Sequence, residues 1–94
     1  MLSKIPTKEE NLSKEQTDSE LLRAGILAEL DAINLYEQMA ATTDDDNLKK
    51  VFMEVAKEEK THVGEFQAML LEHDAEQVKE LKEGKEEVEE ITGK

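Results

Sequence analysis

Residues 21–71 read LLRAGILAELDAINLYEQMAATTDDDNLKKVFMEVAKEEKTHVGEFQAMLL, and apolar side chains recur every three or four positions on both sides of the segment TTDDDN at residues 42–47. Such spacing places the apolar side chains on one face of a helix. The pattern predicts one helix over residues 18–41 and a second over residues 46–72. Because a short turn joins antiparallel neighbours, we expect an all-α protein built on a helical hairpin.

The first helix has a recognisable start, and the segment before it has no helical period. Thr17 stands three residues before Glu20, which is the pattern of a capping box. Residues 1–17 are therefore interpreted as a flexible arm, and residues 18–94 as the folded domain.

A short third helix is expected after the hairpin. Asp74 stands three residues before Gln77, which predicts a helix that begins there and ends at Gly84. The acidic tail, residues 85–94, is predicted to be helical as far as Ile91.

The composition limits what this chain can be. With 94 residues it forms one small domain, and it has no cysteine, which excludes disulfides, thiolate metal sites and thiol catalysis. One hairpin buries little apolar surface by itself. We therefore expect the chain to be stabilised by oligomerisation, by a metal, or by both.

The charge favours cations over nucleic acid as partners. The formal net charge is −12, whereas phosphate contacts need a basic surface. No apolar run approaches the roughly 18 residues of a membrane span, and the sequence starts with no secretory leader. The expectation is a cytoplasmic protein without nucleic-acid or membrane partners.

Ionisable side chains lie at the centre of both apolar stripes, where packing favours a hydrophobic residue. Projected at helical period, Glu29 is central in the first stripe, and Glu59 with His62 is central in the second. Removing a carboxylate from water costs several kcal/mol unless it is paired or binds metal. Neither stripe holds a Lys or Arg. The open alternatives are a metal site, or carboxyls that share hydrogen bonds or pair with His62.

The spacing fits the metal alternative. Positions three apart share a helix face, so Glu59 and His62 can bind one ion together. Ferritin-like di-iron bundles use one Glu from each of two helices and a Glu-x-x-His from each of the other two. This chain holds half of that set, and two hairpins related by a two-fold axis would hold all of it. Carboxylates with imidazole suit iron or manganese.

Three further residues are weaker candidates. Tyr36 lies two turns after Glu29 and is either a neighbour of the site or an ordinary core aromatic. His73 is interpreted as a helix-end histidine. The acids that flank the stripes, Asp31 among them, need no function, although some could hand cations inward.

The segments AELDAINLYEQM (Ala28–Met39) and AKEEKTHVGEF (Ala56–Phe66) resemble the encapsulated ferritins, most closely the ferritin-like domain fused to archaeal encapsulin shell proteins. The resemblance implies a ferroxidase centre of Glu29, Glu59 and His62, shared between two subunits, with Tyr36 beside it. It also implies dimers that form a ferritin-like four-helix bundle and assemble into a ring of ten. An encapsulin shell would be the partner and the iron store.

Two departures from the family pattern matter. Bacterial members carry an acidic cluster outside the site that attracts iron. Of its two acids on the first helix, Asp31 keeps one and Ala28 replaces the other. The ending EEITGK carries no shell-docking peptide, which fits a domain of a longer fusion protein.

The resulting hypothesis is a ferroxidase that oxidises ferrous iron at a di-iron site, located in an encapsulin compartment in the cytoplasm. The alternatives are a rubrerythrin-like peroxidase, a manganese catalase, or a non-catalytic metal-binding helical oligomer.

Overall fold

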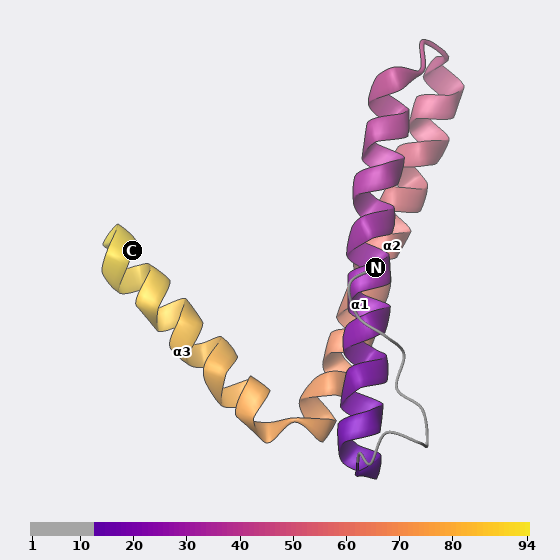
Figure 1. Cartoon of the computed structure of the whole chain (residues 1–94). Helices are drawn as coiled ribbons and strands as arrows, with labels where there is room; N and C mark the ends of the chain where they lie inside the picture. Colours follow the sequence, from indigo (N-terminus) through magenta and orange to yellow (C-terminus); the bar gives the residue numbers. More distant parts are fainter. Residues whose placement is uncertain (1–12) are drawn as a thin grey trace.

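Three α-helices make up almost the whole described chain: α1 (Lys14–Thr42), α2 (Asp46–His73) and α3 (Ala75–Thr92). The computed structural model describes residues 13–94, and there is no strand among them. Figure 1 shows α1 and α2 side by side as an antiparallel hairpin, with α3 extending away from its base. The all-α class and the order of a hairpin followed by a C-terminal helix are confirmed.

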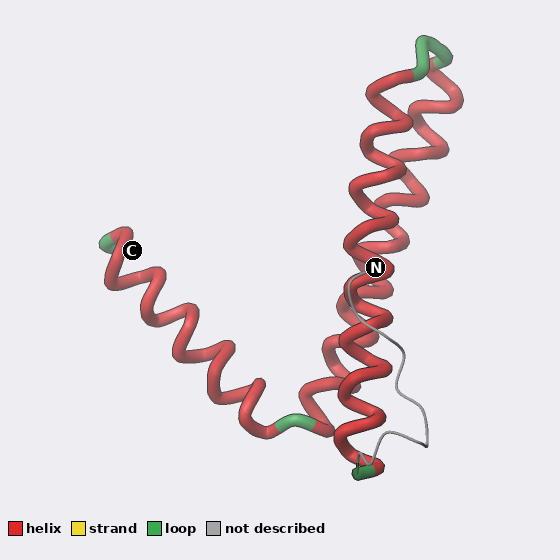
Figure 2. The backbone as a smooth tube through the Cα atoms, in the orientation of Figure 1, coloured by secondary structure: helices red, strands yellow, loops and turns green. Residues whose placement is uncertain are grey.

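The turn between α1 and α2 is shorter than the sequence pattern indicated. Only residues 43–45 lie outside the helices, as the green segment between α1 and α2 in Figure 2 shows. The Asp45 side chain accepts hydrogen bonds from the backbone N–H of Asn47 at 2.8 Å and of Leu48 at 3.1 Å. These bonds satisfy amides that the first turn of α2 leaves free, so Asp45 caps the start of α2.

The first helix begins one turn earlier than predicted. Ser13, rather than Thr17, is the N-cap: its hydroxyl accepts from the N–H of Gln16 at 3.1 Å, and the Gln16 side chain accepts from the N–H of Ser13 at 3.0 Å. Both sites fit a capping box, and the earlier one places Glu15 against His73, at 3.2 Å from Nδ1. The predicted arm is therefore wrong for residues 14–17, and its first 12 residues lie outside the described part of the chain.

The third helix is longer than predicted, because it continues through Gly84 to Thr92. A glycine inside a helix costs about 1 kcal/mol relative to alanine. The helix ends at Gly93, whose φ of 78° is left-handed and is readily adopted by glycine.

The hairpin core is narrow and built from small or branched side chains. Its buried apolar residues are Ile33 and Ala40 on α1, and Ala56 and Leu70 on α2. Several large apolar side chains are left exposed on the same two helices: Leu21, Leu27, Leu30, Leu35, Leu48, Val51, Met53 and Met69. None of the helices within residues 13–94 is both long and apolar enough to cross a bilayer.

One aspartate connects all three helices at the base of the hairpin. Asp74 accepts a hydrogen bond from the backbone N–H of Gln77 at 3.0 Å, and its Oδ2 lies 2.7 Å from Nη2 of Arg23 on α1. The Gln77 N–H, and then the Arg23 guanidinium, hold the pKa of Asp74 below its ordinary value of 3.8. A lowered pKa means that this stabilisation is present above the ordinary pKa and is lost as pH falls through the lowered one.

We expect Asp74→Ala to loosen the first turn of α3, because the variant loses both the cap and the Arg23 pair. The backbone N–H of Gln77 should then exchange faster with solvent, while amides in the middle of the hairpin keep their protection. Hydrogen exchange near neutral pH measures this. Asp74→Asn is the control, since it keeps a capping oxygen and removes only the charge. Unchanged exchange at Gln77 in the Ala variant would contradict the role assigned to Asp74.

Candidate metal centre

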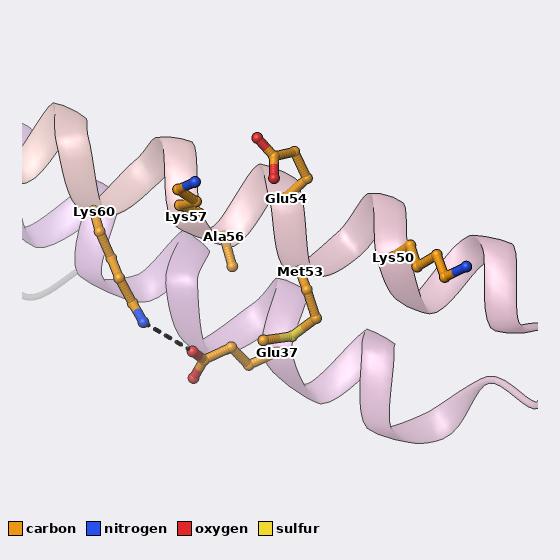
Figure 3. Close-up of a pocket in the computed structure, with 7 residues that line it drawn as sticks. All are labelled: Glu37, Lys50, Met53, Glu54, Ala56, Lys57 and Lys60. Carbon is orange, nitrogen blue, oxygen red and sulfur yellow. Dashed lines mark ion pairs between the residues drawn. The ribbon is translucent and has the colours of Figure 1, made fainter.

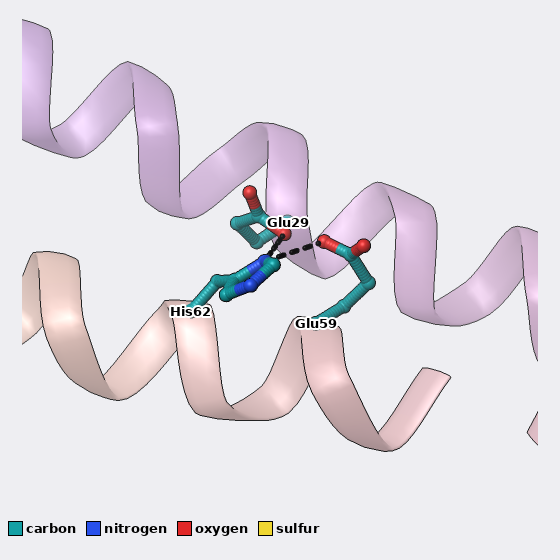
Figure 4. Close-up of side chains that lie close together, drawn as sticks. All are labelled: Glu29, Glu59 and His62. Carbon is teal, nitrogen blue, oxygen red and sulfur yellow. Dashed lines mark hydrogen bonds and ion pairs between the residues drawn. The ribbon is translucent and has the colours of Figure 1, made fainter. Parts of the chain in front are cut away.

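Three ionisable side chains meet in the space between α1 and α2. Glu29 comes from α1, Glu59 and His62 come from α2, and Figure 4 shows all three pointing toward one another. The Nδ1 atom of His62 lies 3.3 Å from Oε2 of Glu29 and 3.3 Å from Oε2 of Glu59. One ligand atom from each residue lies within 4.8 Å of the other two. We call these three residues the Glu–Glu–His cluster.

Helix geometry and the antiparallel hairpin together explain why these three side chains meet. Glu59 and His62 are three residues apart, so they project from one face of α2. The two helices of an antiparallel hairpin run in opposite directions, so residues late in α1 face residues early in α2, and residues early in α1 face residues late in α2. Tyr36 on α1 accordingly stacks on Phe52 of α2, and Glu29, two turns earlier, meets His62.

The two carboxylates are well covered, and the imidazole is more open. The side chains of Glu29 and Glu59 are each 18% exposed, whereas that of His62 is 43% exposed. Among the ion pairs of residues 13–94, none brings a Lys or Arg to either carboxylate. Two acids close together at this depth therefore depend on His62 alone for compensation.

The basic side chains nearby are directed elsewhere. A surface groove beside the hairpin is lined by Lys50, Lys57 and Lys60, and Figure 3 shows Lys60 reaching across to Glu37 on α1. Its Nζ lies 3.4 Å from Oε2 of Glu37. Arg23 is paired with Asp74 at the other end of the hairpin. Among residues 13–94, no Lys or Arg is therefore paired with the cluster.

A metal ion fits this set of donors. Each carboxylate offers two oxygens and the imidazole one nitrogen, which are the ligand types that iron and manganese accept. A proton on Nδ1 can be donated to either carboxylate at 3.3 Å, so the hydrogen-bonded alternative also satisfies the geometry. A divalent cation would compensate both negative charges at once, which a single imidazole cannot do.

The weaker candidates from the sequence lie apart from the cluster. The ring of Tyr36 stacks on Phe52 with centroids 6.4 Å apart and an interplanar angle of 20°, and no hydrogen bond within residues 13–94 joins it to the cluster. Asp31 is exposed on α1. His73 ends α2 and contacts Glu15, as expected for a helix-end histidine.

Two residues that contact His73 and Tyr36 were not identified as their partners from the sequence. Glu15 was assigned to the arm, although the Ser13–Gln16 capping pattern could have placed it on α1. The sequence patterns do not single out Phe52, although pairing Glu29 with His62 across an antiparallel hairpin puts Phe52 opposite Tyr36.

Comparison with known proteins identifies the family of this chain. The EncFtn-like family matches residues 4–84. A ferritin-like–encapsulin shell fusion protein of Pyrococcus furiosus is 56% identical over 96 aligned positions, which cover 99% of this chain. The encapsulin nanocompartment cargo protein EncC of Myxococcus xanthus is 38% identical over 84% of the chain. The chain spans only 28% of the length of the first relative and 63% of the second.

A solved structure shows the same fold. The crystal structure of the encapsulated ferritin domain from Pyrococcus furiosus superimposes with a TM-score of 0.85 and 52% sequence identity, and the match covers 100% of this chain and 98% of the other. The resemblance seen in residues 28–39 and 56–66 is thereby confirmed, and this chain belongs to the EncFtn-like family, the encapsulated ferritins.

Proposed function

We propose that this protein is a ferroxidase that oxidises ferrous iron at a di-iron site shared between two copies of the chain. The observation that carries the proposal is the Glu–Glu–His cluster, in which two covered carboxylates have no Lys or Arg partner within residues 13–94. Membership of the EncFtn-like family supports iron as the metal.

A second copy of the hairpin completes the ligand set. The cluster offers two carboxylates and one imidazole, half of what a ferritin-like di-iron centre uses. The 43% exposure of His62 leaves one side of the cluster open. Two hairpins that face each other across a two-fold axis would close that side and cover some of the apolar surface that one hairpin leaves exposed.

The residues of the cluster have distinct tasks in the proposed reaction. Glu59 and His62 hold one ion from a single helix face, and Glu29 binds from the opposite helix. Glu59 can bridge two ions, because a carboxylate has two oxygens. Three side chains do not fill the coordination sphere of iron, so each ion keeps room for the oxidant. Iron is the substrate here, and it leaves in ferric form.

The electrons and protons balance with either oxidant. Two ferrous ions each give one electron to dioxygen, which takes up two protons and leaves as hydrogen peroxide. When peroxide is the oxidant, two ferrous ions and two protons convert it into two water molecules. Solvent water supplies the two protons that each reaction consumes.

The proposed setting is an encapsulin compartment in the cytoplasm. The Pyrococcus relative is described as fused to an encapsulin shell and the Myxococcus relative as an encapsulin cargo protein. We extend that partner to this chain, together with a ring of five dimers. The shell would then hold the ferric product.

We expect the iron-loaded protein to be at least a dimer, because a single hairpin leaves both its cluster and its leucines open to water. Native mass spectrometry with ferrous iron under anaerobic conditions measures the state directly. A species of only 10.7 kDa under those conditions would contradict the shared site.

The ligand role of His62 is tested by His62→Ala. Loss of a partner outside the first coordination shell costs roughly 10- to 100-fold in activity, so loss of a ligand should slow iron oxidation by at least that much. Helix content should be unchanged, because His62 is only partly buried. His73→Ala is the control, since it removes the other histidine without touching the cluster. Parent-like oxidation by His62→Ala would place the site elsewhere.

Peroxide consumption by the parent without net iron oxidation would favour a rubrerythrin-like peroxidase.

The role of Glu29 is tested by melting the parent and Glu29→Leu with and without ferrous iron. Without metal the variant should be as stable or more stable, because a leucine replaces a charge in an interface. Iron at 100 times its dissociation constant should add about 2.7 kcal/mol to the parent and much less to the variant. Glu37→Leu is the control, because it removes a charge from α1 outside the cluster. Equal gains in the parent and Glu29→Leu would exclude Glu29 as a ligand.

A further inference from the structure

We propose that Gly25 and Phe66 are positioning residues, whose contact sets the separation of α1 and α2 at the metal centre. The inference rests on the proposed function, because it concerns the geometry of the same ligands. A β-carbon built on Gly25 would lie 3.2 Å from Cδ2, 3.3 Å from Cε2 and 3.5 Å from Cγ of the Phe66 ring. The ring of Phe66 thus lies directly against the backbone of α1.

The contact lies one helical turn from a ligand on both helices. Gly25 precedes Glu29 by four residues on α1, and Phe66 follows His62 by four residues on α2. Residues four apart lie on one face and about 6 Å apart along the axis. Any change in the helix separation at Gly25 is therefore transmitted to the Glu29–His62 distance, which is 3.3 Å.

Close contacts also lie between the cluster and the turn that joins α1 to α2. Ala56, one turn before Glu59, is 1% exposed, and the Tyr36–Phe52 stack lies further toward the turn. The cluster is therefore held between two closely packed places. Metal ligands need to be held within about 0.5 Å of their productive positions, so a few tenths of an ångström at one of these places matters.

The choice of residue supports this role. Glycine is the least favourable residue after proline inside a helix. Gly64, on the exposed face of α2, has nothing within 4 Å of a built β-carbon, so the two hairpin glycines differ in their surroundings. Gly25→Ala and Gly64→Ala carry the same intrinsic gain in helix stability, and only the first adds a methyl group against Phe66.

The test is a titration of the metal-free protein with Co²⁺, followed by visible absorption, together with thermal melting without metal. Co²⁺ reports ligand geometry through its absorption band and is not oxidised under these conditions. We expect Gly25→Ala to melt no lower than the parent and to bind Co²⁺ on the order of tenfold more weakly, with an altered band. Gly64→Ala should gain helix stability and bind as the parent does.

The double variant Gly25→Ala, Phe66→Leu supplies the rescue. It roughly conserves the volume at the contact, so it should bind Co²⁺ more tightly than Gly25→Ala alone and recover the parent band. A residue that served only packing would change the melting temperature in the single variants without changing the band. If Gly25→Ala does not fold, Phe66→Leu alone decides, with weaker binding expected because the spacer is smaller.

Two results separate the possible failures. Parent protein that binds no Co²⁺ would refute the proposed function and this inference with it. Parent that binds Co²⁺ while Gly25→Ala binds equally well with the same band would overturn the positioning role and leave the metal centre in place.

Discussion

Two carboxylates and an imidazole lie between α1 and α2, where the buried residues Ile33 and Ala56 are apolar. Charged groups withdrawn from water need compensation within the same interface, and among the described residues only His62 contacts both acids. Three features of the hairpin are consistent with this constraint. Its register brings the three side chains together, its helices lie close to one another, and Lys60 and Arg23 pair with other acids. A hairpin built for stability alone would place leucines at these positions.

The same constraint accounts for the incompleteness of the single chain. The buried core amounts to a few small and branched residues, while leucines on the outer faces of α1 and α2 remain exposed, and the cluster is open at His62. The hydrophobic core and the proposed ligand set are thus both incomplete in a single chain. A second apolar surface that carries acids and an imidazole would complete both. In the proposed dimer, association would complete the core and the ligand set together, so that metal binding and assembly are thermodynamically linked.

The third helix stands outside this arrangement. It contributes no buried residue and diverges from the hairpin in Figure 1, held at its base by Asp74. Its apolar side chains Val78, Leu81, Val88 and Ile91 are exposed on an otherwise charged helix. The Glu–Glu–His cluster is formed by α1 and α2 alone. In the proposed assembly, α3 could therefore change its orientation without changing the cluster.

Periodicity in the sequence was enough to determine the helical hairpin, the aspartate at its turn and the placement of Glu29, Glu59 and His62 on inward faces, because helix geometry fixes which residues share a face. The start of α1 and the end of α3 could not be determined in this way. Two capping patterns compete before α1, and the contact between Glu15 and His73, 58 residues apart, accompanies the earlier one. Only the tertiary structure decided the distances within the cluster, the stacking of Tyr36 on Phe52 and the contact of Phe66 with Gly25. All three depend on how far apart the two packed helices lie, and that separation is a property of both helices together.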